Sequence, residues 1–245
     1  MDNQSLGNVL AILRLLRATP PNMTALLVIR SWGGPAASDV AVLKVASYAI
    51  EQALAARQVI ENSQLGNEAK QGVLGTIDSV AATFTLDNIH SPWGQWVKDV
   101  NGAIANIVIL LSALGLDTER VAPKEALDLA EEVEGLYQAF DDPDLDPMVR
   151  DVAKRHLVIL STLLRHVPVF GLEGALATYF ELVLKIRRTD AHTTPTAQAK
   201  LDPLFNKVKT WGERLGVLDK AWNSGSRLLE HAGKAQDLLQ YIPIL

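Results

Sequence analysis

Apolar residues recur along this chain at the spacing of α-helices. After Ser91-Pro92, the large apolar positions are Trp93, Trp96, Val97, Val100, Ile104, Ile107 and Leu111. Separations of three and four residues place side chains on one face of a helix. Strict alternation of apolar and polar residues, which is typical of a half-buried strand, runs for no more than about four residues between turn signals. The pattern therefore predicts an all-α protein, a multi-helix bundle of roughly nine to ten antiparallel helices.

Prolines that follow a capping residue mark where several helices are predicted to begin. Proline fits the first helical position because its missing N–H has no partner there, and a preceding Ser or Asp side chain accepts hydrogen bonds from the next free amides. The pattern occurs at Ser91-Pro92, Asp146-Pro147 and Asp202-Pro203. Together with the apolar spacing, it predicts helices over residues 5–18, 21–31, 35–63, 67–84, 92–111, 123–140, 147–164, 171–188, 196–215 and 219–240.

Two of the predicted helices are unusually apolar. In residues 35–63 the polar side chains form only a narrow stripe, so we expect neighbouring helices to cover most of the remaining surface. The apolar positions expected to be covered include Val40, Leu43 and Leu54. The segment Ala103–Leu116 contains fourteen mostly apolar residues. Because a membrane span needs roughly 20 such residues, we expect this segment to be a buried helix of the core.

Charged residues are distributed unevenly along the chain. Residues 1–116 contain only fifteen of them, with a net charge of −1. Residues 117–149 carry eleven acidic and two basic residues, and residues 150–245 carry fourteen basic and nine acidic ones. The composition changes just after Gly115, a residue type common at helix ends. We therefore expect two packed sub-bundles, a low-charge one over residues 1–116 and an acidic-then-basic one over residues 117–245.

The overall composition argues against several classes of function. Of the 245 residues 48% are apolar, which is enough for a packed core, and the net charge is −5. An acidic chain is a poor nucleic-acid binder, because phosphate affinity comes chiefly from Lys and Arg. The lack of cysteine excludes disulfides, thiolate metal sites and a cysteine nucleophile. The first residues are acidic rather than basic, so we expect no secretory signal and a soluble cytoplasmic protein.

The motifs present in the sequence predict no cofactor and no metal site. Acidic residues from Asp142 onward resemble the start of a calcium loop, but Pro147 and Ala153 stand where that loop needs Gly and Glu. The histidines do not form the i, i+4 pair of a zinc protease. An enzyme would have to combine residues from separate helices, and the candidates for such a site are His156, Glu173 and Glu181.

Both ends of the chain are strongly apolar and are candidates for partner binding. Burying a Leu, Ile or Tyr side chain stabilises by about 1.5–3 kcal/mol relative to exposure, so such segments are expected to dock on a surface. The candidate residues are Leu10, Leu13, Arg14 and Arg17 near the N-terminus and Leu239, Tyr241, Ile242, Ile244 and Leu245 at the C-terminus. For the C-terminal residues we expect docking on the chain's own core, with another subunit, another protein or a membrane as the alternatives.

A second candidate surface is basic. On the helix that begins at Pro147, helical spacing places Arg150, Lys154 and Arg165 on or near one face. This face is a candidate receptor for an acidic partner or for the acidic 117–149 segment of a second copy. The alternative interpretation is a solvated face, since exposed charges contribute little by themselves.

These observations predict a non-catalytic helical protein–protein interaction module. Such an adaptor, scaffold or regulatory subunit would bind another protein or itself, with no cofactor, metal or nucleic acid. The alternative hypothesis is a membrane-acting effector, such as a bacterial toxin or defence protein, that exposes its apolar helices on triggering. A third hypothesis is an enzyme with a site between helices.

Overall fold

The computed structural model describes residues 4–34, 38–116, 122–143, 145–190 and 195–223, and this part of the chain is almost entirely helical. It contains no strand, and one isolated bridge joins Thr24 to Pro92. The all-α prediction is confirmed. The elements, in chain order, are α1 (Gln4–Arg17), α2 (Ala25–Gly33), α3 (Asp39–Glu61), α4 (Asn67–Thr83), the 3-10 helix η1 (Trp93–Gln95), α5 (Val100–Ala113), α6 (Lys124–Tyr137), the 3-10 helix η2 (Gln138–Asp141), α7 (Pro147–Arg165), α8 (Val167–Phe170), α9 (Glu173–Asp190) and α10 (Pro195–Asn223).

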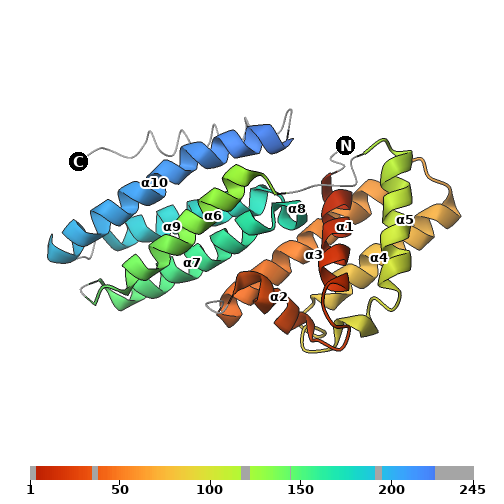
Figure 1. The fold of residues 1–245 in the computed structure, drawn as a ribbon, viewed down its shortest axis with the longest axis horizontal. Coiled ribbons are helices and arrows are strands. Elements are labelled where there is room, and N and C mark those ends of the chain that lie inside the picture. Colours follow the sequence, from red (N-terminus) through yellow and green to blue (C-terminus); the bar gives the residue numbers. More distant parts are fainter. Residues whose placement is uncertain (1–3, 35–37, 117–121, 144, 191–194, 224–245) are drawn as a thin grey trace.

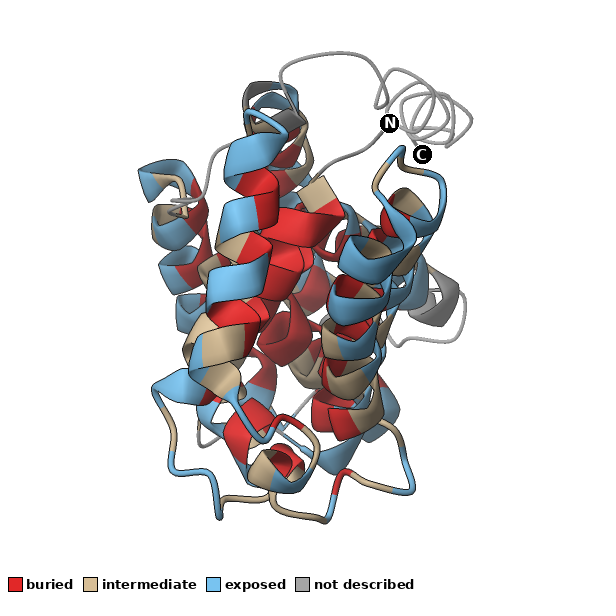
Figure 2. Cartoon of the chain, turned by 90° about the vertical axis from the view of Figure 1, so that its right-hand side faces the viewer, coloured by how far each residue is buried: buried red, intermediate tan, exposed pale blue. Residues whose placement is uncertain are grey.

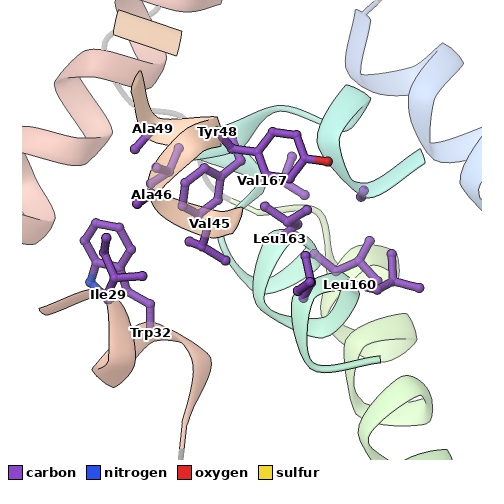
Figure 3. Packing of buried hydrophobic residues seen from close by; sticks show 14 of the residues in the cluster. Ile29, Trp32, Val45, Ala46, Tyr48, Ala49, Leu160, Leu163 and Val167 are labelled. Atoms are coloured by element: carbon purple, nitrogen blue, oxygen red, sulfur yellow. The ribbon is translucent and has the colours of Figure 1, made fainter. Parts of the chain in front are cut away.

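The helices form two groups that pack directly against each other. Helices α1 to α5 lie on the right in Figure 1, helices α6, α7, α9 and α10 lie on the left, and α8 lies between them. Buried apolar residues of both groups belong to one continuous core cluster. At the junction, Val45 from the first group lies beside Leu163 from the second (Figure 3). The division into sub-bundles of residues 1–116 and 117–245 stays a prediction.

Helix α7 is at the centre of this packing. Every residue from His156 to Leu164 is buried, because α6, α9, α3 and α2 all pack against α7. Its start matches the sequence prediction. The Asp146 carboxylate accepts hydrogen bonds from the backbone amides of Met148 at 2.7 Å and Val149 at 3.3 Å, and Pro147 occupies the first helical turn.

Three predicted helix starts are wrong, those at Pro92, at Pro203 and at residue 219, since α10 continues past residue 219 to Asn223. After Pro92 the amides of Trp93 and Gly94 donate to backbone carbonyls of residues 23 and 21 instead of forming a helix. Only the short η1 forms there, and α5 begins at Val100, where Asp99 accepts a hydrogen bond from the Gly102 amide at 2.9 Å. Pro203 lies inside α10 rather than at its start. A proline inside a helix removes one backbone hydrogen bond, and α10 tolerates it while burying Leu201, Val208, Trp211 and Leu215.

Burial follows one side of each outer helix, as Figure 2 shows. On α5, Ile107 and Leu111 are buried, but Ile109 is 67% exposed. The expectation of a buried core helix therefore holds only for the inward face of α5, whose other face lies at the surface. The same correction applies to α3. Three of its apolar side chains that we expected to be covered are 38–50% exposed, namely Leu43, Leu54 and Val40.

Candidate functional site

The N-terminal candidate residues lie on α1, which packs against α3, α4, α5 and α8. Leu10 and Leu13 are 1% and 0% exposed. Their side chains belong to the protein's own core and form no docking surface, which corrects the expectation for these two residues. Arg14 is half-buried and Arg17 is exposed in the last turn, where a positive charge is favourable beside the helix C-terminus. The C-terminal candidates Leu239, Tyr241, Ile242, Ile244 and Leu245 lie outside the described residues.

The predicted basic face of α7 is largely engaged within the chain. Arg165 donates two hydrogen bonds to the Glu134 carboxylate of α6, at 2.8 and 2.7 Å. Lys154 contacts Asp141, and its Nζ lies 4.2 Å from the centre of the Tyr137 ring. These carboxylate hydrogen bonds raise the pKa of both basic side chains above their usual values. Arg150 is half-buried, and no ion pair is found for it among the described residues.

The acidic segment pairs with α10 as well as with α7. Arg214 donates to Glu132 at 2.7 Å, and Lys200 lies 3.0 Å from Asp142. Each of these pairs is substantially exposed and contributes about 1 kcal/mol or less. With the Arg165–Glu134 and Lys154–Asp141 pairs, they engage four acidic side chains of the 117–149 segment within one chain.

Polar side chains from three helices meet where α3 crosses α7 and α9. Glu181 lies 3.4 Å from Lys44 Nζ and 3.5 Å from His156 Nε2. The Tyr48 hydroxyl lies 3.3 Å from the Thr178 hydroxyl, and Lys44 Nζ is 5.4 Å from the centre of the Tyr48 ring. We call these five residues the α3–α7–α9 cluster.

The fold thus brings together two of the three residues that were candidates for an inter-helix site. His156 is buried, and its Nδ1 lies 2.8 Å from the Val152 carbonyl oxygen, which can only accept. Its Nε2 is therefore the nitrogen that faces Glu181. The third candidate, Glu173, does not belong to the cluster and is exposed at the first residue of α9. The sequence contains both His156 and Glu181, but it cannot reveal that two separate helices bring them into contact.

The outer face of α5 is the surface that sequence reasoning missed. Helix α5 packs against α1 and α4 at the edge of the molecule (Figure 1). It has no charged residue, and among the described α-helices longer than one turn no other shares this property. Its exposed positions are Asn101, Ala105, Asn106, Ile109, Ser112 and Ala113. The sequence indicates this face only through the lack of charged residues in the helix, a feature that by itself predicts burial.

Comparisons of this chain with protein-family models, curated proteins and solved structures find no match. Within the described residues, no three His, Asp or Glu side chains are grouped so that they could hold a metal ion. No helix in this part of the chain combines the length and apolar character required to cross a membrane. The candidate surfaces are therefore interpreted from their own geometry.

Proposed function

We propose that this protein is a non-catalytic helical interaction module that assembles with a second copy of itself through apolar helix faces of residues 1–116. The observation that carries the proposal is the exposure of Ile109 in the middle of a helix without charges. A large apolar side chain in water at such a position gains free energy when a partner covers it, about 1.5–3 kcal/mol for full burial.

The distribution of exposed apolar side chains supports a docking surface within residues 1–116. Among the described residues, seven of the eleven exposed large apolar side chains belong to residues 1–116. They are Leu27, Val40, Leu43, Leu54, Leu86, Ile109 and Leu114. The same half carries few charges, so docking here desolvates few charged groups. Charged residues of both halves also form ion pairs within the chain, as at Arg57 and Asp78 or at Arg165 and Glu134.

Size-exclusion chromatography with light scattering, on the full chain over a range of loading concentrations, tests the proposal. We expect the mean mass to rise from that of one chain, 26.6 kDa, towards twice this value. A constant mass of one chain at every concentration would contradict self-assembly. Binding to liposomes, with dye leakage, would instead favour the membrane-acting alternative.

A further inference from the structure

The C-terminal part of α5 and the two residues that follow it are symmetric in residue class about Ile109. With Ile109 as the midpoint, residues at equal distances on either side match in size and polarity. The pairs are Val108 with Leu110, Ile107 with Leu111, Asn106 with Ser112, Ala105 with Ala113, Ile104 with Leu114, and Ala103 with Gly115. A surface that contacts its own copy across a twofold axis must be complementary to itself. Among the exposed positions of α5, Ala105 with Ala113 and Asn106 with Ser112 meet this requirement about Ile109.

The exposed members of these pairs define how two copies of α5 would be aligned along each other. Two helices related by a perpendicular twofold axis run antiparallel, so with Ile109 on the axis Ala105 of one chain lies opposite Ala113 of the other. Small side chains at both positions let the helix axes approach towards the lower end of the usual distance of about 8–10 Å. On the flank of the contact, Asn106 lies opposite Ser112, and an amide and a hydroxyl can hydrogen-bond to each other.

The absence of charge on α5 favours a second copy as the occupant. A residue on the twofold axis meets its own counterpart, so a charged side chain there would face a like charge. Helix α5 has none. The macrodipoles of two antiparallel helices also oppose each other, which places the positive end of one beside the negative end of the other.

A membrane surface fits this face less well. Helices that lie on a bilayer usually combine bulky apolar side chains with a rim of Lys and Arg. The outer face of α5 instead carries Ala105 and Ala113 among the polar residues Asn101, Asn106 and Ser112. Small and uncharged polar side chains are better suited to close packing against another helix.

We infer that α5 is the contact between two copies of this chain, packed antiparallel with Ile109 on the twofold axis. The inference rests on the proposed function and adds the surface and its register. A helix of 14 residues is about 21 Å long, and one such face buries less than the roughly 800 Å² per partner of a standard interface. The dimer is therefore expected to dissociate on dilution.

Disulfide crosslinking of single-cysteine variants tests the inference, because the full chain has no cysteine of its own. We expect Ile109→Cys to form a covalent dimer under mild oxidation, read on a non-reducing gel. The matched control is Val217→Cys on α10, since Val217 is 68% exposed and Ile109 67%. Crosslinking of the control as fast as the Ile109→Cys variant would overturn the inference.

Mixing two variants tests the register. In the inferred dimer Ala105→Cys faces Ala113→Cys of the second copy, so a mixture of the two variants should crosslink. Ala105→Cys alone should not, because its two copies are offset by eight residues, about 12 Å along the helices, whereas a disulfide spans Cα atoms up to about 7 Å apart. Self-crosslinking of each variant with no gain on mixing would mean parallel packing and would also overturn the inference.

The inference and the proposed function can fail separately. If light scattering shows a dimer but Ile109→Cys does not crosslink faster than Val217→Cys, the interface lies elsewhere and the proposed function stands. If the chain is a monomer at every concentration, both fail. Circular dichroism checks that each variant keeps the helical fold, which is expected because Ile109, Ala105 and Ala113 are exposed.

Discussion

The surroundings of Tyr179 fix its side chain closely. It is buried on α9, its ring centre lies 5.3 Å from that of Phe180, and its hydroxyl donates to the Lys209 carbonyl of α10 at 3.4 Å. Burial raises the pKa of Tyr179 to about 12. On α10, a Cβ atom added at Gly212 would lie 2.6 Å from the hydroxyl oxygen. The close contact between α9 and α10 therefore depends on glycine at this position.

We expect Gly212→Ala to lower the free energy of unfolding by about 1–3 kcal/mol, the usual cost of overpacking. The new methyl group has to displace a buried ring that has little room to move. Urea unfolding measures the change. The matched control is Gly216→Ala on the same helix, where no atom lies within 4 Å of the added Cβ, and which should gain up to about 1 kcal/mol from helix propensity.

A Tyr179→Phe background separates this contact from other effects of the substitution. Phenylalanine lacks the oxygen that is nearest to the added methyl group, so Gly212→Ala should cost less in that background. An equal cost in both backgrounds would show that the Tyr179 hydroxyl does not cause the destabilisation.

At the scale of single elements, the sequence predicted a helix start correctly where the signal needs no residue outside that helix. Asp146-Pro147 starts α7 as expected, because the cap and the proline need only their own helix. Ser91-Pro92 failed because the amides of Trp93 and Gly94 find carbonyl partners in residues 21 and 23, about 70 positions earlier. A distant partner of this kind leaves no local trace in the sequence.

Burial was harder to predict than helicity. An apolar helix can be covered on all sides, like the second half of α7, or lie at the edge with one face in water, like α5. The sequence of α5 fits both cases, and only the arrangement of α1 and α4 decides between them. The contact between His156 and Glu181 was likewise beyond local signals, because it depends on the register between two helices.

We expect Asp146→Ala to lower the free energy of unfolding by about 1 kcal/mol, since the start of α7 then loses its capping carboxylate. The hydrogen bonds lost are those from the amides of Met148 and Val149. Thermal or urea unfolding measures the difference. Asp151→Ala, at an exposed position of the same helix, is the control and should cost less. An equal loss in both variants would contradict the capping role.

At the scale of the whole molecule, an aromatic cluster holds the two helix groups together. The Trp32 ring lies 6.0 Å, centre to centre, from each of the rings of Phe84, His166 and Phe170. Trp32 and Phe84 come from the first group, His166 caps the end of α7 in the second group, and Phe170 belongs to α8 between them. Burial lowers the pKa of His166 below its usual value of 6.5, and the nearby Arg165 charge lowers it further. A hydrogen bond with the Trp32 backbone acts in the opposite direction.

This lowered pKa predicts that the junction weakens in acid. The unfolded chain takes up the proton more readily than the folded chain, so the contribution of neutral His166 is complete above about pH 6.5 and is lost as the pH falls below it. The loss from one such group approaches at most about 1.4 kcal/mol per pH unit. As the pH is lowered from 8 to 5, the free energy of unfolding should therefore fall less steeply in His166→Phe than in the unchanged chain.

The exposed His90 supplies the control variant His90→Gln, which removes a histidine outside the aromatic cluster. If the slopes of His166→Phe and the unchanged chain coincide, protonation of His166 does not weaken the junction.

Assembly through the outer face of α5 is the central claim, and sedimentation equilibrium of three full-length chains tests it most directly. The unchanged chain and Val217→Glu should both follow a monomer–dimer equilibrium between 26.6 kDa and twice that mass. Ile109→Glu should raise the dissociation constant at least tenfold, because two like charges then meet at the twofold axis. If Ile109→Glu and Val217→Glu give the same dissociation constant, or if all three chains sediment as monomers, the claim is wrong.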